Sequence, residues 1–400
     1  FDPGPDSTKF TAASGGEAYL VKLDPKGNFI KVWTYGKTTG GHTVVGNNLK
    51  IDKSGNIYTT GYSAGSNVDF DPDSIGIFKL SYLNTGNNVY IQKLDSTGKF
   101  IWAVRWAYDM EAGSNNMTEE GPSMDMDQSG NFITVGRFTG TKDFDPGTGV
   151  KNIVGRVQDG YISKIDNSGK FQWVRHIACD TTANSYVFPK SVSLDNNGNI
   201  FVAGYFKGGV DFDTDSAKTN IIVTDLQVGF VAKYDPNGNY LWVKTIGNPN
   251  LKLLEYHVAN AVKADLEGNI YVTGSFMDTY DFGNTKLTSK GNSDIFITKL
   301  DAAGNYIWAK QIGSFYDSET GFVLNTDNSN DVYVSGWFRG TADFNPGAGA
   351  SNLTSKGLMD VFLVKLDNSG DFKWAASIEG ELAGDLLHQL VIDGNSIVSV

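Results

Sequence analysis

Two short sequence patterns recur along the chain and constrain its fold more than any other feature. The first, typified by Lys-Leu-Asp-x-x-Gly-x-aromatic-x-Trp, carries its aspartate at positions 24, 95, 166, 235, 301 and 367. The second, Asp-x-x-Gly-Asn-x-Tyr/Phe-Val-x-Gly, alternates with it and starts at positions 52, 127, 195, 265 and 327, with a shortened sixth copy at 393. The mean spacing of about 69 residues indicates a protein built from six similar units.

Each unit predicts four β-strands. In the copy near the middle of the chain we expect strands at 258–264, 269–273, 294–300 and 306–312, joined by two Asp-x-x-Gly turns and one longer connection. These runs are short, rich in β-branched and aromatic residues, and bounded by turn residues. The middle strands are apolar on both faces, as in sheets that stack radially. We therefore predict an all-β fold, a six-bladed β-propeller with four-stranded antiparallel blades.

The two ends of the chain each hold half a unit. Residues 1–38 carry the second half and residues 383–400 the first half, so we expect N- and C-terminal strands to pair and close the ring. Residues 1–400 are then a single propeller domain. Because the sequence starts inside a repeated motif and without Met, we expect a fragment of a larger multidomain protein.

The repeats resemble the bacterial β-propeller repeat family (SBBP-like repeats), typified by Asp-Ala-Phe-Val-x-Lys-Leu-Asp-x-x-Gly followed by Gly-Asn-x-Tyr-Val-x-Gly. The variant with Asp-Phe-Asp-Pro-Gly, as at 143–147, resembles that of secreted multidomain proteins of Bacteroidetes and similar bacteria. The resemblance covers essentially the whole chain. It implies an extracellular or cell-surface bacterial module, and no catalytic residues belong to the repeat signature.

Charge and composition exclude several classes of function. The 33 basic and 45 acidic residues give a net charge of −12, and no block of Lys or Arg stands out, so we expect no nucleic-acid partner. The single cysteine, Cys179, excludes an intramolecular disulfide and a Cys-based zinc site. No run of about 18 apolar residues occurs, so we expect no membrane insertion.

Residues that recur in every unit are interpreted as structural. We expect the turn aspartates to bond to the local backbone. In Asp-Phe-Asp-Pro-Gly only the aromatic recurs throughout, beginning with Phe1, which favours a turn over a calcium cage. We expect the tryptophans to pack blade against blade, rather than form a sugar-stacking ring, and the phenylalanines to plug into the blades. These structural residues are Trp33, Trp102, Trp173, Trp242, Trp308, Trp374, Phe70, Phe144, Phe212, Phe282 and Phe344.

The connections that do not repeat are expected on one face, where a rigid scaffold presents recognition loops. They are acidic and aromatic, a composition suited to Ca²⁺, sugars or a cationic partner, although a solvated acidic rim is the alternative. The candidate binding residues there are Asp109, Glu111, Glu119, Glu120, Tyr186, Glu255, Tyr256, His257, Tyr316, Asp317 and Glu319.

We predict a non-enzymatic, secreted or cell-surface module that is a structural scaffold or binds a protein or glycan. Other domains of the same polypeptide are further expected partners. The alternative is a metal-dependent propeller enzyme, lactonase- or lyase-like or glycan-cleaving, with Asn260, Asn325, His257 and His388 at its central channel. The four histidines lack metal-ligand spacing, and no Gly-x-Ser-x-Gly, P-loop or His-Glu-x-x-His motif occurs.

Overall fold

The computed structural model of the chain contains β-strands as its regular elements. Within the described residues no helix occurs that is long and apolar enough to cross a membrane. The all-β prediction is confirmed. The structure describes residues 15–24, 28–36, 42–64, 68–73, 76–80, 88–107, 123–181, 184–213, 221–247, 256–283, 285–315, 318–378, 390–393 and 396–399.

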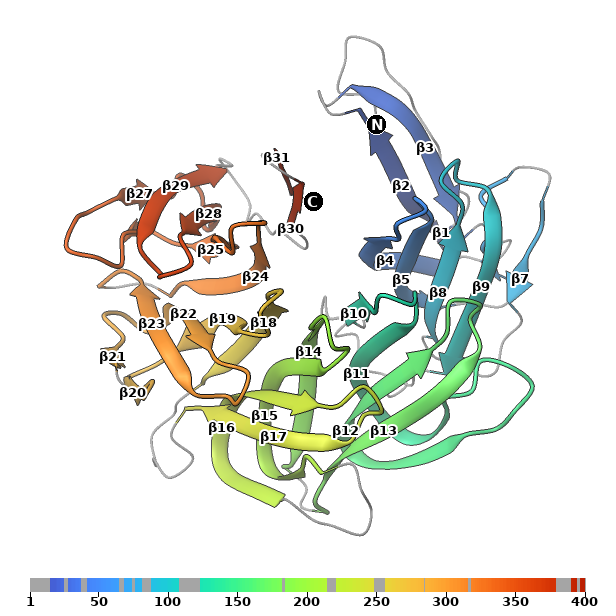
Figure 1. Cartoon of the computed structure of the whole chain (residues 1–400), viewed down its shortest axis with the longest axis horizontal. Coiled ribbons are helices and arrows are strands. Elements are labelled where there is room, and N and C mark those ends of the chain that lie inside the picture. Colours follow the sequence, from blue (N-terminus) through green and yellow to red (C-terminus); the bar gives the residue numbers. More distant parts are fainter. Residues whose placement is uncertain are drawn as a thin grey trace. The chain divides into compact units, whose positions relative to one another are not determined.

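The described residues contain five four-stranded antiparallel meanders (Figure 1). In each, strand order in the sheet follows strand order in the chain, as the repeat predicts. The strands are β4 (His42–Ile51), β5 (Ile57–Ala64), β8 (Asn88–Leu94) and β9 (Phe100–Ala107); β10 (Ser123–Met126), β11 (Phe132–Asp143), β12 (Asn152–Ile165) and β13 (Phe171–Cys179); β14 (Tyr186–Leu194), β15 (Ile200–Asp211), β16 (Ile221–Tyr234) and β17 (Tyr240–Ile246); β18 (Val258–Ala264), β19 (Ile270–Phe276), β22 (Asp294–Leu300) and β23 (Tyr306–Ile312); and β24 (Thr320–Thr326), β25 (Val332–Phe338), β28 (Asp360–Leu366) and β29 (Phe372–Ile378).

Two shorter antiparallel pairs lie near the chain ends. The first joins β2 (Ala18–Leu23) to β3 (Phe29–Tyr35), and the second joins β30 (Leu390–Asp393) to β31 (Ser396–Ser399). A two-residue strand, β1 (Gly15–Gly16), runs parallel to β4. The terminal segments therefore form strand pairs, as half-units should.

The chain divides into two compact units. Unit 1 comprises Phe1–Gly155 and Ser163–Val174, and unit 2 comprises Arg156–Ile162 and Arg175–Val400. Unit 2 contains the three C-terminal meanders.

The predicted strand boundaries hold closely in the fourth meander except in β19, which begins at Ile270 and not at 269. Strand β19 continues to Phe276, beyond the expected end at 273, because Gly274 allows the neighbouring strand to approach closely. A Cβ atom on Gly274 would lie 1.8 Å from the carbonyl oxygen of Val258. The glycine of the second pattern is therefore required by packing inside the strand and does not end it.

Each meander is extended by the connection between its second and third strands. Three small hairpins form there: β6 (Val68–Asp69) with β7 (Lys79–Leu80), β20 (Thr279–Asp281) with β21 (Lys286–Thr288), and β26 (Thr341–Asp343) with β27 (Asn352–Thr354). In the second and third meanders, β11, β12, β15 and β16 are themselves long enough to form this extension. The Asp-Phe-Asp-Pro-Gly segments occupy these extensions.

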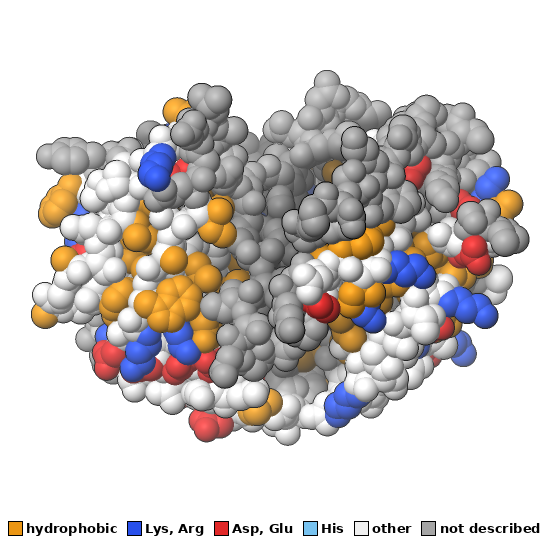
Figure 2. All heavy atoms as spheres, turned by 90° about the horizontal axis from the view of Figure 1, so that it is seen from above, with side chains coloured by type: hydrophobic (Ala, Val, Ile, Leu, Met, Phe, Trp, Pro, Cys, Tyr) orange, Lys and Arg blue, Asp and Glu red, His pale blue; other side chains and the backbone are white. Residues whose placement is uncertain are grey.

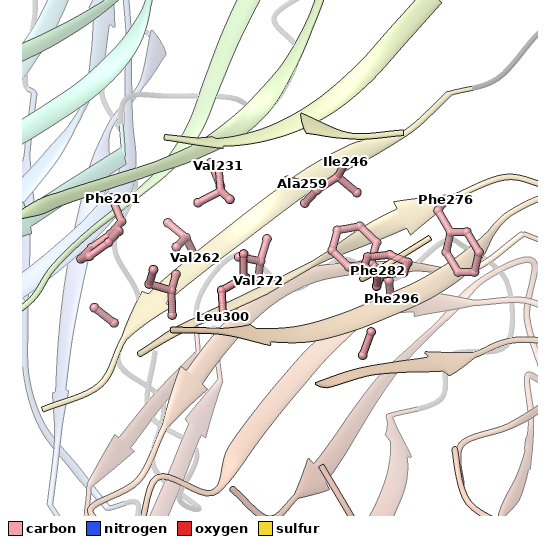
Figure 3. Close-up of a cluster of buried hydrophobic side chains, with 14 residues drawn as sticks. Phe201, Val231, Ile246, Ala259, Val262, Val272, Phe276, Phe282, Phe296 and Leu300 are labelled. Atoms are coloured by element: carbon pink, nitrogen blue, oxygen red, sulfur yellow. The ribbon is translucent and has the colours of Figure 1, made fainter. Parts of the chain in front are cut away.

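Successive sheets of unit 2 share a hydrophobic core. Phe201, Val231 and Ile246 of one sheet pack against Val262 and Leu300 of the next (Figure 3). Every residue of β19 and β22 is buried, so these strands are covered on both faces. Burying such a side chain contributes about 1.5–3 kcal/mol, which makes sheet-on-sheet packing a major source of stability.

Candidate binding surface

Short turns join the first strand of each meander to the second and the third strand to the fourth. Each of these turns is closed by hydrogen bonds to its own aspartate. At Asp95, Oδ1 accepts hydrogen bonds from the backbone N–H groups of Thr97 (2.8 Å) and Lys99 (2.9 Å). The hydroxyl of Thr97 donates to the same oxygen at 2.7 Å. These bonds, led by that from the Thr97 side chain, lower the pKa of Asp95. The turn carboxylates are thus satisfied by the chain itself, as the Asp-x-x-Gly spacing predicts.

The repeated tryptophans connect one sheet to the next. The indole Nε1–H of Trp242 donates to the carbonyl oxygen of Ala302 at 3.4 Å, and that of Trp308 donates to Asn368 at 3.1 Å. In unit 1, Trp102 donates to Asn167 at 3.3 Å. Each acceptor follows the aspartate of the next short turn. All six tryptophans lie on the outer strands β3, β9, β13, β17, β23 and β29.

A lysine of the first pattern lies beside the tryptophan and takes part in the same contact. Lys233 pairs with Phe201 on one side and Trp242 on the other, and its Nζ lies 5.1 Å from the Phe201 ring centre. The same Nζ donates to the Ala302 carbonyl at 2.9 Å, so one backbone oxygen accepts from both Lys233 and Trp242. Phe201, Lys233 and Trp242 thus form one group, and its lysine and tryptophan join the sheet to its neighbour.

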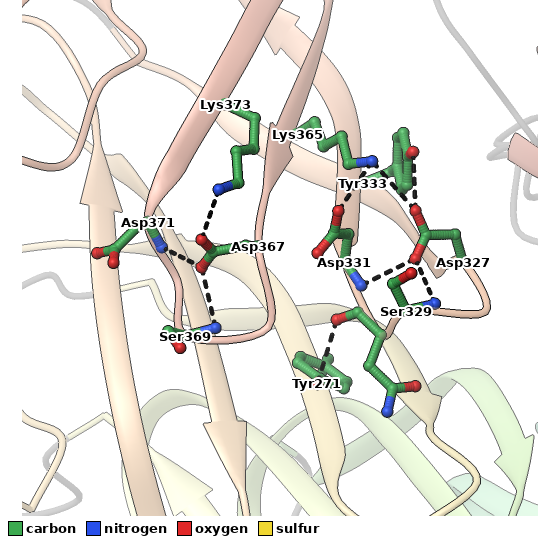
Figure 4. A network of polar contacts seen from close by, with 11 residues as sticks. Tyr271, Asp327, Ser329, Asp331, Tyr333, Lys365, Asp367, Ser369, Asp371 and Lys373 are labelled. Atoms are coloured by element: carbon green, nitrogen blue, oxygen red, sulfur yellow. Dashed lines mark hydrogen bonds and ion pairs between the residues drawn. The ribbon is translucent and has the colours of Figure 1, made fainter. Parts of the chain in front are cut away.

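The last meander shows a variant of this arrangement (Figure 4). Lys365 lies 4.7 Å from the Tyr333 ring centre and forms ion pairs with Asp327 (3.1 Å) and Asp331 (2.9 Å). Burial alone would raise the pKa of Asp327, but bonds from Lys365 and the local backbone lower it. The acidic groups of this turn are internally paired.

The Asp-Phe-Asp-Pro-Gly segment forms a turn stabilised by its own side chains. Asp143 Oδ1 accepts from the backbone N–H groups of Asp145 (3.0 Å) and Lys151 (2.7 Å). Asp145 Oδ1 accepts from Gly147 N–H at 2.8 Å, and in another copy the neutral amide of Asn345 makes the equivalent bond at 2.8 Å. The turn is therefore held by hydrogen bonds within the chain. The phenylalanines at 70, 144, 212, 282 and 344 are at most 1% exposed.

One group outside these turns has the composition of a catalytic site. The buried Asp159 has Oδ2 2.6 Å from His176 Nε2, and its Oδ1 accepts from Cys179 N–H at 3.2 Å. The Cys179 thiol donates to the Gln158 carbonyl at 3.3 Å. Burial, with Asp159 adding to it, raises the pKa of this thiol, which opposes thiolate formation.

The equivalent position in other units explains this group as structural. Asp294 accepts backbone N–H bonds from Lys290 (3.2 Å) and Gly291 (3.4 Å), and Asp360 accepts one from Lys356 (2.6 Å). Asp294 and Asp360 thus hold the loop that precedes the third strand. Asp159 accepts from Arg156 N–H at 3.1 Å within β12 itself, and His176 bonds to it at the position from which Gln311 bonds to Asp294.

Seven of the predicted binding residues fall outside the described residues. The predictions for these positions stay predictions, and the acidic character of the loops is carried mainly by them. They are Asp109, Glu111, Glu119, Glu120, Glu255, Tyr316 and Asp317.

Three predicted binding residues come together around Gln227 in unit 2. The Tyr186 hydroxyl donates to Gln227 Oε1 at 3.0 Å, and the backbone N–H of His257 donates to the Gln227 carbonyl at 3.3 Å. Tyr256 forms a bridge with Gln227 and leaves 52% of its surface exposed. Burial, with Tyr256 nearby, raises the pKa of Tyr186. Tyr186 and Tyr256, which are far apart in the sequence, thus lie in one cluster around Gln227.

Glu319 has a different role from the one predicted. Its side chain is fully buried, and its carboxylate accepts hydrogen bonds from the Ser314 hydroxyl (2.6 Å) and the Ser314 backbone N–H (3.3 Å). It therefore closes the loop between β23 and β24. A ligand in solvent cannot reach a carboxylate placed in this way.

Sequence reasoning missed the residues that extend the tyrosine cluster. Phe188 stacks on Tyr205 with ring centres 4.9 Å apart and planes at 10°, and Tyr186 meets Phe188 edge-on at 5.4 Å. Lys190 Nζ lies 5.7 Å from the Tyr205 ring centre and 5.5 Å from that of Phe322. We call this group, Tyr186, Phe188, Lys190, Tyr205, Tyr256 and Phe322, the aromatic patch.

The sequence does contain a signal for the aromatic patch. The signal is variation between the units at one position, and not repetition. The residue after the last glycine of the second pattern changes from unit to unit: Tyr62, Arg137, Tyr205, Ser275 and Trp337. All of these positions lie on the second strand of a meander, at the end from which the long connections leave. Divergence at one fixed place in a repeat marks a surface that each unit can use differently.

The side chains suggested for a catalytic alternative are engaged in the framework or are not described. Asn260 Nδ2 donates to the Gly321 carbonyl at 2.9 Å, and Asn325 Nδ2 donates to the Leu390 carbonyl at 3.1 Å. His257 is 1% exposed, and His388 lies outside the described residues. Among the residues that the structure describes, no group of three or more His, Cys, Asp or Glu could hold a metal ion.

The surface seen in Figure 2 mixes its charges. Among the side chains that Figure 2 colours, blue lysine and arginine lie among red acidic ones and orange hydrophobic ones.

Comparison with known proteins supports the repeat interpretation. Residues 172–205 match a family model described as a β-propeller repeat. A curated, uncharacterized WD repeat-containing protein of Acanthamoeba polyphaga mimivirus is 24% identical over 370 residues, which is 80% of this chain and 26% of that protein. The regulatory protein FlaEY of Caulobacter vibrioides is 26% identical over 137 residues, 34% of this chain and 14% of that protein.

The chain thus spans far less than two thirds of either relative. Among solved structures, that of a eukaryotic initiation factor aligns over 91% of this chain and 96% of its own, with 6% identity and a TM-score of 0.26. The meanders, the matched repeat segment and the WD-repeat relative together describe this chain as a β-propeller-type repeat protein.

Proposed function

We propose that this protein is a six-bladed β-propeller module that binds a glycan or a protein through the end of its sheets from which the long connections leave, without catalysing a reaction. In this proposal the β2–β3 and β30–β31 pairs complete the sixth blade. Six copies of the two sequence patterns support the count. A closed ring would also protect the edges of its sheets.

The aromatic patch is the observation that carries the binding role. The repeated Asp, Trp and Lys side chains form turns and contacts between sheets. We therefore assign ligand binding to other side chains. The patch is built from side chains that do not repeat, and Tyr256 within it is 52% exposed. Aromatic rings with a few polar groups are typical of binding sites.

The resemblance to Asp-Phe-Asp-Pro-Gly repeats of secreted proteins supports a further part of the proposal. We place the module in a secreted or cell-surface bacterial protein of several domains. Ca²⁺ at the acidic connections is a separate proposal, because those residues lie outside the described part. A chelator that leaves the melting temperature unchanged would remove it.

The binding role is tested on a glycan and peptide array with the purified chain. Tyr256→Ala should reduce the array signal, because it removes an exposed ring from the patch. Tyr19→Ala is the matched control, since Tyr19 is 58% exposed on β2. Equal signals for both variants would place the binding surface elsewhere. Cleavage of any array glycan or of a lactone, followed by mass spectrometry, would contradict the non-enzymatic role.

A further inference from the structure

Two of the short turns in unit 2 contain Asn-Gly, a dipeptide that occurs nowhere else in the chain. One copy, at 197–198, joins β14 to β15, and the other, at 237–238, joins β16 to β17. In most of the equivalent turns Ser or Thr precedes the glycine, as at Ser54 and Ser168. The amide gives the two Asn-Gly turns a reactivity that Ser and Thr lack. The backbone nitrogen of the glycine can attack the amide carbon of the asparagine, and glycine has no Cβ atom to hinder the approach.

Both turns hold the Asn-Gly peptide in the same way. The Asn197 N–H donates to Asp195 Oδ1 at 2.9 Å, and the Gly198 N–H donates to the Asp195 carbonyl at 3.0 Å. In the second turn the corresponding distances, to Asp235, are 2.8 and 2.9 Å. Both asparagines are exposed. The glycine nitrogen leaves its hydrogen bond before it reaches the amide carbon, so the peptide plane between the two residues has to turn.

The two turns differ in what holds the main-chain carbonyl of the asparagine. The Arg175 guanidinium on β13 donates from Nη2 to the Asn237 carbonyl at 2.6 Å. Within the described residues, the carbonyl of Asn197 has no such bond. Gly198 is also partly exposed, whereas Gly238 is buried. Because hydrogen bonds to charged groups are stronger than neutral ones, turning the peptide plane costs more at Asn237. Asn197 is therefore the more reactive of the two.

The Asn197 turn also contacts the next sheet. Its neighbour Asn196 donates from Nδ2 to the Leu266 carbonyl, in the first short turn of the fourth meander, at 3.2 Å. Asp195 is 9% exposed, and its carboxylate accepts from the N–H groups of Asn197 and Asn199, both at 2.9 Å, and from Asn199 Nδ2 at 2.7 Å. These bonds depend on the standard spacing of main-chain atoms. An additional main-chain carbon in this turn would disturb its closure and displace Asn196 from its acceptor.

We propose that Asn197 is a spontaneous deamidation site, and that its conversion to isoaspartate weakens the contact between the third and fourth meanders. In the first step the Gly198 nitrogen bonds to Asn197 Cγ, its proton passes through water to the amide nitrogen, and ammonia leaves. The product is a succinimide, and water then opens this ring. Opening at Cγ gives aspartate, and opening at the main-chain carbonyl gives isoaspartate, in which the chain runs through the former side chain with one more carbon. Water is the only co-reactant.

The test is peptide mapping of the whole folded chain by mass spectrometry, during storage in mildly alkaline buffer at physiological temperature. We expect deamidation at Asn197 to be about tenfold faster than at Asn237, a factor that corresponds to about 1.4 kcal/mol of activation free energy. Arg175→Met should raise the rate at Asn237 relative to that at Asn197, because it removes the bond to the Asn237 carbonyl. Both sites are measured in one sample, so a general loss of stability changes the two rates together.

The structural effect of the product is measured on the isoaspartate fraction, separated by chromatography. We expect this fraction to melt at a lower temperature than the fresh chain. Freshly purified Asn197→Asp, which gains the charge without the additional carbon, should melt close to the wild type. Asn197→Ser is the matched control, because Ser168 stands at the equivalent position of another turn, and its melting temperature should not change on storage.

Three results would overturn the inference. The first is deamidation at Asn237 that is as fast as at Asn197, and the second is an Arg175→Met variant in which the ratio of the two rates is unchanged. The third is an isoaspartate fraction that melts at the same temperature as the fresh chain. None of these results bears on the proposed binding role, which the array tests separately.

Discussion

The two ends of each meander differ in how far their side chains and contacts repeat from unit to unit. At the short-turn end, Asp-x-x-Gly turns of nearly identical geometry bond to themselves and accept the Trp and Lys donors of the preceding sheet. At the long-connection end, equivalent positions carry Lys190, Asn260 and Phe322, or His176 and Gln311. The comparison teaches that the hydrogen bonds repeated between sheets lie at one end and that chemical variety is permitted at the other.

The largest effect should come from removing a tryptophan contact between sheets. Trp308→Ala loses the indole packing and the bond to Asn368, so we expect a loss of about 3 kcal/mol in unfolding free energy. Urea denaturation measures it. Tyr256→Ala, at the opposite end, should cost less than about 0.5 kcal/mol, as exposed positions do. Similar losses in the two variants would contradict the comparison.

A smaller effect is expected from filling the space beneath a tryptophan. Gly304 has φ +83°, and an added Cβ would lie 3.3 Å from the Trp242 ring, so Gly304→Ala should destabilise by about 1–2 kcal/mol. Gly140→Ala is the control, because Gly140 has φ +65° but nothing within 4 Å of an added Cβ. The difference between the two unfolding free energies isolates the contact with Trp242. A difference of zero would mean that backbone strain alone accounts for the cost.

At the variable end, exchanging one partner of a buried aspartate should cost about 1 kcal/mol. His176→Gln gives Asp159 the kind of partner that Asp294 has in Gln311. Burial raises the pKa of Asp294 despite Gln311. At Asp159 burial acts in the same direction, but His176 and the backbone N–H groups of Arg156 and Cys179 together outweigh it and lower the pKa. We therefore expect the pKa of Asp159 to rise in the variant, as followed by carboxyl carbon-13 NMR. A pKa that stays low would show that the backbone N–H bonds suffice.

The smallest single-site effect concerns acid stability. Hydrogen bonds lower the pKa of Asp95 in the folded chain, so its contribution is present above the unfolded value near about 3.9 and is lost as pH falls through the lower, folded pKa. The melting temperature should therefore fall below about pH 4. Asp95→Asn should weaken this dependence slightly and change stability little at pH 7. A steeper acid loss in the variant would reverse the assigned sign.

The repeats could be identified from the sequence because the geometry of the short turns requires the same residues in every unit. The Asp and Gly of each turn, and the Trp that packs on it, recur because every copy needs the same contacts. The aromatic patch could not be found in this way, since Phe188, Lys190 and Phe322 differ from their counterparts in the other units. Their placement also depends on bulges that only cross-strand pairing defines. Tyr186 and Tyr256 were predicted from loop composition, but their meeting at Gln227 was not.

The contact between sheets uses a main-chain carbonyl as its acceptor, supplied by Asn167, Ala302 or Asn368. A backbone oxygen is available whatever side chain follows the turn aspartate, so a neighbouring unit is recognised by the shape of its turn and not by its residue identity. A duplicated unit would therefore offer the same acceptor to its neighbour whatever residue stands at that position. Such a contact helps gene duplication to lengthen or shuffle the array while residues that are not shared between copies, such as those of the aromatic patch, diverge.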